Sequence, residues 1–100
     1  MALTKFGFIV TGSGLDPQKH RVEFASKQFT TIVVGVTRPE QAIDVARALV
    51  SEGIQLLELC GGFGPIWTGK IIEALNNQIP VGAVAYGPES IDGMHALFST

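Results

Sequence analysis

The sequence predicts an α/β fold: a small, mostly parallel sheet of four or five strands, two crossover helices and a short C-terminal helix. Three observations support this. Runs of β-branched and apolar residues alternate with segments that have the 3.6-residue period of a helix. The connecting segments are long enough for right-handed crossovers between parallel strands. A chain of 100 residues is the length of one domain, so residues 1–100 are expected to form a single α/β domain.

The first half of the chain contains two predicted strands. Residues 5–11 (KFGFIVT) have the pattern of a buried strand, and residues 12–17 (GSGLDP) end it with turn-forming residues. Residues 29–36 (FTTIVVGV) form the second strand. Between them, residues 18–28 are ambiguous, and a short edge strand is one alternative because Val22 and Phe24 alternate with polar neighbours.

A helix is predicted to follow residue 37. Thr37 and Glu40 have the spacing of a capping box, and Pro39 lies in the first turn, where its missing N–H costs nothing. Gly53 is expected to end this helix. Its apolar stripe consists of Ala42, Val45, Ala46 and Leu49.

The second half continues the alternation. Residues 54–60 and 80–86 are predicted strands, residues 65–76 a helix closed by Asn77, and residues 90–98 a final helix begun by Ser90. The helix over residues 65–76 is expected to bury Trp67, Ile71, Ala74 and Leu75. The glycines that interrupt predicted strands suggest close approach by a helix or another backbone: Gly7, Gly35 and Gly82.

The composition favours self-association. Hydrophobic residues make up 46% of the chain and charged residues 16%, whereas soluble domains usually carry about 25% charged residues. We therefore expect a homo-oligomer, most simply a two-fold dimer, with an apolar face packed against another copy. The net charge of −2 provides no electrostatic footprint for nucleic acid or an anionic membrane.

Cysteine usage and the N-terminus favour the cytoplasm. A single cysteine allows no internal disulfide, makes a closed zinc site improbable and fits a reducing compartment, so no metal and no cofactor are expected. Residues 1–14 lack the basic leader and cleavage site of a signal peptide. No apolar run reaches the roughly 18 residues that a membrane span requires.

The glycine-rich loop of residues 60–65 is the candidate site. The segment from Gly64 to Lys70 matches the P-loop spacing, but Ile71 stands where a magnesium-binding Ser or Thr is needed. A thiolate phosphatase loop fails because residue 66 is Ile66 rather than arginine. A nucleophile elbow centred on Cys60 requires a small residue where Glu58 stands.

We expect this loop to bind a small polar or anionic molecule. Three glycines allow close approach of the backbone, and a helix that starts at Pro65 directs its free N–H groups to this point. In open parallel sheets ligands bind beyond the carboxyl ends of the strands. The predicted ligand-binding residues are Cys60, Gly61, Gly62, Phe63, Gly64, Thr11, Ser13 and Tyr86, with Gly12, Thr37 and Gly87 at the same edge.

Two alternatives stay open: a small enzyme that uses Glu58 or Cys60, and a purely structural homo-oligomer. Strand alternation places Glu58 and Cys60 on one face, where Glu58 is either a buried carboxylate or a residue on an exposed sheet face or at a subunit boundary. The histidines, His20 and His95, have no sequence context that brings them to Cys60.

The chain also resembles a family of small bacterial proteins known only as a domain of unknown function. The segments that carry the resemblance are VVGV at 33–36, LELCGGFGP at 57–65 and PVGAVAYG at 80–87, together with Asp16-Pro17 and residues 19–21. The resemblance implies an α/β fold and no assigned activity or catalytic residues.

Overall fold

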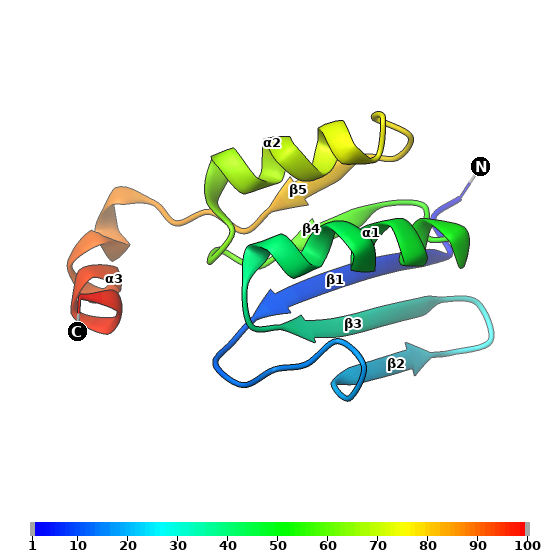
Figure 1. Cartoon of the computed structure of the whole chain (residues 1–100), viewed down its shortest axis with the longest axis horizontal. Coiled ribbons are helices and arrows are strands. Elements are labelled where there is room, and N and C mark those ends of the chain that lie inside the picture. The colour runs from blue at the N-terminus through cyan, green and yellow to red at the C-terminus, as the bar shows by residue number, and fades with distance from the viewer. Residues whose placement is uncertain (1, 100) are drawn as a thin grey trace.

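A computed structural model describes residues 2–99 of the chain (Figure 1). It contains five strands, three α-helices and two short 3₁₀ turns. Their bounds are β1 Lys5–Thr11, β2 Arg21–Ala25, β3 Thr30–Val36, η1 Pro39–Gln41, α1 Ala42–Ser51, β4 Leu57–Leu59, α2 Gly64–Ala74, β5 Val81–Ala83, η2 Pro88–Ser90 and α3 Ile91–Phe98.

The five strands form one sheet in the order β2-β3-β1-β4-β5. The central strand β1 runs parallel to both β3 and β4, and β4 runs parallel to β5. Only β2 is antiparallel, and it pairs with β3 at one edge of the sheet. The predicted α/β fold with a mostly parallel sheet is therefore confirmed, and the ambiguous segment 18–28 contains the edge strand.

Both crossover helices cover the same face of the sheet. The connections from β3 to β4 and from β4 to β5 advance in the same direction across the sheet, so right-handed crossovers place α1 and α2 side by side (Figure 1). The connection from β1 to β3 runs in the other direction and contains β2 instead of a helix. No helix is therefore supplied to the opposite face, which these elements leave open.

The core lies between the sheet and the pair formed by α1 and α2. Every strand residue in it points to the helix-covered face, whereas the alternate residues of the same strands are half-buried or exposed, apart from Gly35, which Leu15 covers. The core consists of Ile9, Ile32, Val34, Val36, Ala42, Ala46, Leu49, Ile54, Leu57, Leu59, Phe63, Ile71 and Leu75. Its residues come from both crossover units, so it ties the three central strands to the helices.

Two of the three strand glycines are sites of close approach. A Cβ built on Gly7 would lie 3.1 Å from atoms of Leu49 and Ile54, and one on Gly35 would lie 2.9 Å from Leu15. Gly82 differs from the expectation, because its Cβ would meet no atom within 4 Å. The reason is that Gly82 faces the side of the sheet that α1 and α2 leave open.

The start of α1 differs from the predicted capping box. Pro39–Gln41 forms a 3₁₀ turn, so the α-helix begins only at Ala42. The side-chain Oε1 of Gln41, rather than Glu40, accepts the N–H groups of Thr37 (2.8 Å) and Arg38 (3.0 Å). The Thr37 hydroxyl instead donates to the Leu15 carbonyl at 2.5 Å. The extra turn moves Gln41 to the position from which it can reach back.

Several element ends also lie inside the predicted bounds. β4 and β5 each cover three residues, because β5 is an edge strand that pairs only with β4 and its last ladder bond runs from Val84 N–H to Leu59 C=O at 2.9 Å. Helix α2 ends at Ala74 rather than at residue 76. Asn76 and Asn77 follow with positive φ angles of 53° and 54°, a conformation that asparagine tolerates and that ends a helix.

Helix α3 projects beyond the carboxyl ends of the strands and away from α1 and α2 (Figure 1). The Cα radius of gyration is 14.0 Å, whereas a compact chain of this length has about 13 Å. The projecting helix accounts for the longest dimension of 40 Å. None of the helices described between residues 2 and 99 is long and apolar enough to cross a membrane.

Candidate functional site

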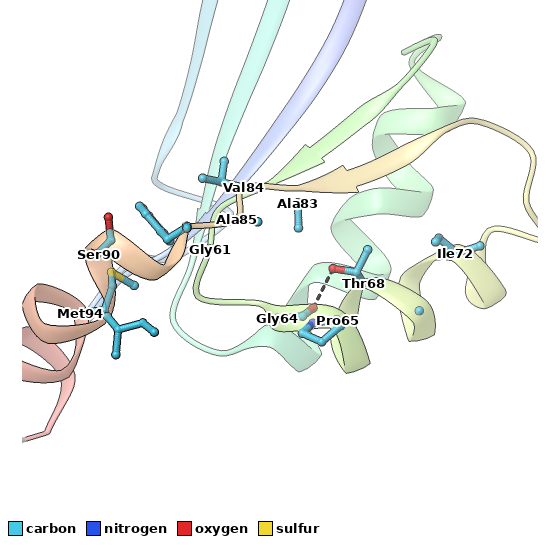
Figure 2. Close-up of a pocket in the computed structure, with 14 residues that line it drawn as sticks. Gly61, Gly64, Pro65, Thr68, Ile72, Ala83, Val84, Ala85, Ser90 and Met94 are labelled. Carbon is cyan, nitrogen blue, oxygen red and sulfur yellow. Dashed lines mark hydrogen bonds between the residues drawn. The ribbon is translucent and has the colours of Figure 1, made fainter.

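A groove of about 700 Å³ lies at the carboxyl ends of β4 and β5. Figure 2 shows α2 on one side of it, the segment of residues 83–85 on the other, and Ser90 and Met94 at one end. Its lining consists of Gly61, Gly64, Pro65, Thr68, Gly69, Ile72, Ala83, Val84, Ala85, Tyr86, Gly87, Ser90, Ile91 and Met94. The lining is predominantly apolar, and none of these residues carries a formal charge.

One face of helix α2 lines this groove. Pro65, Thr68, Gly69 and Ile72 have the i, i+3, i+4, i+7 spacing of one helix face, while Ile71 packs into the core on the opposite side. The groove-lining face is made of small residues, and a Cβ on Gly69 would meet nothing within 4 Å. The hydroxyl of Thr68 donates to the Gly64 carbonyl at 2.7 Å, as the dashed line in Figure 2 shows.

The glycine-rich loop forms the inner end of the groove. The Cys60 N–H donates to the Ile9 carbonyl at 3.1 Å, and the Phe63 N–H donates back to the Cys60 carbonyl at 3.2 Å, which closes a tight turn. Among the described residues no protein acceptor lies within hydrogen-bond reach of the amides of Gly61, Gly62 and Gly64. These amides lie at the start of α2, whose first residue is Gly64. The positive end of the helix dipole lies there.

Each loop glycine has its own structural reason. Gly64 has a φ of +67°, which favours glycine because it has no Cβ. A Cβ on Gly61 would lie 2.8 Å from the ring of Tyr86, and a Cβ on Gly62 would overlap the hydroxyl of Thr11. The loop is thus packed between β1 and the segment that follows β5.

A second hollow of about 440 Å³ adjoins the groove and contains Cys60. The Thr11 N–H donates to Cys60 Sγ at 3.3 Å, and Thr11 Oγ1 also lies 3.3 Å from that sulfur. Gly61, Tyr86 and Met94 line both spaces, so the hollow and the groove form one depression.

Glu58 lies outside this depression. Its neighbours Leu57 and Leu59 are buried under the helices, and the Glu58 side chain is exposed on the opposite face of the sheet. The structure thereby decides between the two alternatives for this carboxylate in favour of the exposed sheet face.

Neither histidine reaches the cysteine. His20 Nδ1 accepts the Asp16 N–H at 2.8 Å in the turn before β2, and His95 is exposed on α3. No described His, Asp or Glu lines the groove or the hollow. Over residues 2–99 there is also no group of three or more His, Cys, Asp or Glu side chains that could hold a metal ion. The depression therefore offers a thiol and backbone amides, with no adjacent general base among the described side chains.

Lys70, the lysine of the P-loop-like spacing, points away from the groove. Its Nζ lies 4.2 Å from the centre of the Trp67 ring on the outer side of α2. A P-loop lysine must reach the phosphates in front of the loop. The geometry therefore gives no support to that alternative.

The structure brings together six of the eight predicted ligand-binding residues. Thr11, Cys60, Gly61, Gly62, Gly64 and Tyr86 line the groove or the hollow, and Gly87 does so as well. Phe63 does not, because its side chain is buried in the core. Ser13 lies on an exposed turn and lines neither space, while Gly12 and Thr37 bond to the backbone nearby.

Sequence reasoning missed two parts of the lining. The first is the groove-lining face of α2, which the helical spacing of Pro65, Thr68, Gly69 and Ile72 could have revealed as a stripe of small and apolar residues distinct from the core stripe. The second is α3, whose residues reach the groove only through the path of residues 84–90. No local sequence pattern signals that path.

A model of a family of unknown function (DUF6506) matches residues 4–99, nearly the whole chain. The match confirms the resemblance to a family of unknown function. Comparisons with curated proteins and with solved structures gave no match.

Proposed function

Because the chain belongs to a family of unknown function (DUF6506), we propose its function from the geometry of the groove. We propose that the protein binds a small organic molecule with a flat apolar body and a small polar or anionic end, without chemical turnover. The single observation that carries this proposal is an apolar groove with the unpartnered amides of Gly61 and Gly64 at its inner end and that of Gly62 in the adjoining hollow.

The apolar body of the ligand is supported by the lining of the groove. Small residues on α2 and on residues 83–85 leave the space open, and Ile72 supplies apolar contact. A volume of about 700 Å³ falls within the range of about 300–1,000 Å³ that is usual for small-molecule sites.

The polar end is supported by the amides of Gly61, Gly62 and Gly64. Unpaired N–H groups next to the start of a helix favour an anion, because donors and the helix dipole act in the same direction. No aspartate or glutamate lines the groove among the described residues, and the carboxylate of Glu89 lies beside the lining, next to Gly87. A carboxylate or phosphate group fits this end.

The enzyme alternative receives less support from the geometry. Cys60 Sγ has Thr11 as its polar neighbour, and a thiol nucleophile ordinarily needs a base or cation beside it. Glu58 lies on the open face of the sheet and cannot act on a ligand in the groove. The purely structural alternative rests on that open face.

The test is an NMR titration of the uniformly ¹⁵N-labelled chain with phenyl phosphate, and in parallel with inorganic phosphate. We expect phenyl phosphate to produce saturable shifts in the amide signals of Gly61, Gly64 and Gly69, with weaker binding of inorganic phosphate because it lacks the apolar body. Gly69→Leu should abolish the phenyl phosphate shifts, since the new side chain occupies the groove. Lys70→Leu, which adds the same side chain on the outer side of α2, is the matched control.

Two results would overturn the proposal. One is a set of shifts confined to the open face of the sheet, for example at Phe8 and Val33. The other is equal binding by the wild type and Gly69→Leu.

A cytoplasmic location is proposed as well, on the strength of the single cysteine. A bacterial origin is proposed from the family resemblance alone.

A further inference from the structure

One face of the sheet carries an apolar surface that α1 and α2 do not cover. The strand register sets its side chains in two rows across the strands. One row is Val22, Val33, Phe8 and Glu58, and the other is Phe24, Thr31 and Phe6. We call these seven residues the open face. Val22 is 53% exposed and Phe24 is 64% exposed, which is unusual for large apolar residues on a sheet.

Helix α3 carries a second uncovered apolar surface. Ile91, Met94, Leu97 and Phe98 lie within about 120° of one another on the helix, given 100° per residue. We call them the α3 stripe. Ile91 is 63% exposed, and Leu97 and Phe98 are each 73% exposed. An isolated helix of eight residues is marginal in water, so this stripe requires a partner surface for stability.

The chain holds α3 away from its own open face. The Val84 N–H bonds to the Leu59 carbonyl at 2.9 Å, and the ring of Tyr86 packs against Gly61. These contacts direct residues 84–90 past the carboxyl ends of the strands, and α3 lies beyond them (Figure 1). Met94 and Phe98 reach only the end of β1, at Val10 and Thr11. The rows that contain Phe8 and Phe6 lie nearer the amino end of β1. They are out of reach of α3 of the same chain and are left to another occupant.

We propose that the occupant is a second copy of this chain: the α3 stripe of each copy packs on the open face of the other in a two-fold dimer. Each copy then donates one helix and receives one, which is the self-complementary arrangement of a two-fold interface. The arrangement supplies the sheet with a helical layer on its second face, as is usual in α/β proteins with parallel strands.

The area is sufficient for a stable dimer. Each α3 stripe exposes most of three large apolar side chains, or roughly 400 Å² when each contributes somewhat less than a fully buried aromatic residue. The open face contributes a similar area. Two equivalent contacts therefore bury roughly 1,600 Å² in total, the usual size of a specific interface.

The charged residues of the two surfaces do not oppose this docking. Glu58 is the one charged residue of the open face as defined above, and it lies beside the apolar Phe8. His95 flanks the α3 stripe and is the one basic residue of the helix sequence IDGMHALF. Asp92, the one acidic residue of α3, lies on the side of the helix away from the α3 stripe, so docking of the stripe brings no carboxylate of α3 against Glu58.

The first test measures the mass of the full chain by light scattering at 5–100 μM, a range chosen to span the usual affinity of such interfaces. We expect a dimer. Leu97→Glu should raise the dissociation constant at least tenfold, because it places a charge within a desolvated apolar contact. Leu97 is exposed in the single chain, so this substitution leaves the fold of each copy intact. Ala96→Glu adds the same charge on the opposite side of α3 and should leave the dimer unchanged.

The second test locates the contact by disulfide formation. In a Cys60→Ser background, one copy carries His95→Cys and a second copy with a longer tag carries Glu58→Cys. Oxidation of the mixture should join one copy of each kind. The proposal is overturned by a monomer at all concentrations, by a dimer that is insensitive to Leu97→Glu, or by a double variant (His95→Cys with Glu58→Cys) that closes only within one chain.

Discussion

Gly64→Ala and Gly69→Ala add the same methyl group to α2, and we expect them to change the stability in opposite directions. At both positions the new Cβ meets no atom within 4 Å, so packing does not distinguish them. The backbone does. Gly64 has a φ of +67°, which an L-residue adopts at a cost, whereas Gly69 lies in the interior of the helix outside the left-handed region.

The two magnitudes follow from these conformations. Alanine is favoured over glycine in a helix interior by about 1 kcal/mol, so Gly69→Ala should raise the free energy of unfolding by that amount. Alanine in the left-handed region costs about 1–2 kcal/mol, so Gly64→Ala should lower it by that amount. With a urea m-value of about 1–2 kcal/mol/M, the unfolding midpoints of the two variants should differ by at least about 1 M.

Urea unfolding can be followed by far-ultraviolet circular dichroism and by the fluorescence of Trp67, which lies on α2 itself. Both probes should give the same unfolding midpoint. The protein concentration is held at one fixed value, because dimerisation makes stability depend on concentration. A Gly64→Ala variant as stable as the wild type would refute the assignment of a left-handed turn at the start of α2. A destabilised Gly69→Ala variant would show that the groove is not open at this point.

Three further predictions concern the core, the edge strand and the cysteine. Leu59→Ala should lower the free energy of unfolding by about 3 kcal/mol in urea, because Leu59 is fully buried at the centre of the core; a loss below 1 kcal/mol would contradict that burial. Glu52→Gln should cost less than about 1 kcal/mol at pH 7, because its partner Arg21 and Glu52 itself are each more than a third exposed and screened by solvent. The hydrogen bond from Arg21 holds the pKa of Glu52 below its usual value of 4.5. The contribution of this ion pair to the free energy of unfolding is therefore present above pH 4.5 and is lost as the pH falls through the folded pKa. Equal melting temperatures of the wild type and Glu52→Gln at pH 7 would contradict this prediction. Iodoacetamide should label Cys60 in the folded protein, because the thiol lines an open hollow; labelling only at the rate of global unfolding would place the sulfur in the core instead.

The open face has its origin in the connection between β1 and β3. A helix there would cover the second face of the sheet and complete a doubly wound fold. Because residues 21–25 form an edge strand instead, the second face keeps its apolar residues uncovered. Arg21 ties this strand to the end of α1 through two bonds to Glu52 of 2.8 and 2.6 Å.

The fold class could be predicted from the sequence because it depends on local patterns. The β-branched run of residues 29–36 and the helical stripe that includes Ala46 and Leu49 each reflect burial of one side of an element. The glycine-rich loop could likewise be placed at the carboxyl edge of the sheet, since in a parallel sheet a loop between a strand and the following helix always lies there. Element ends were less predictable: the predicted Thr37–Glu40 capping box was wrong because a 3₁₀ turn moved the helix start to Ala42.

The sequence by itself determined that an α/β sheet would form and that a tight, glycine-dependent turn would follow its central block. Only the tertiary structure decided which face of the sheet is covered, and therefore that Glu58 is exposed and that Phe63 belongs to the core. Only it showed that α3 stands clear of its own sheet while Met94 lines the groove. The physical reason is that strand alternation specifies two faces without saying what covers each. That depends on the direction of every crossover, which is a property of the whole chain.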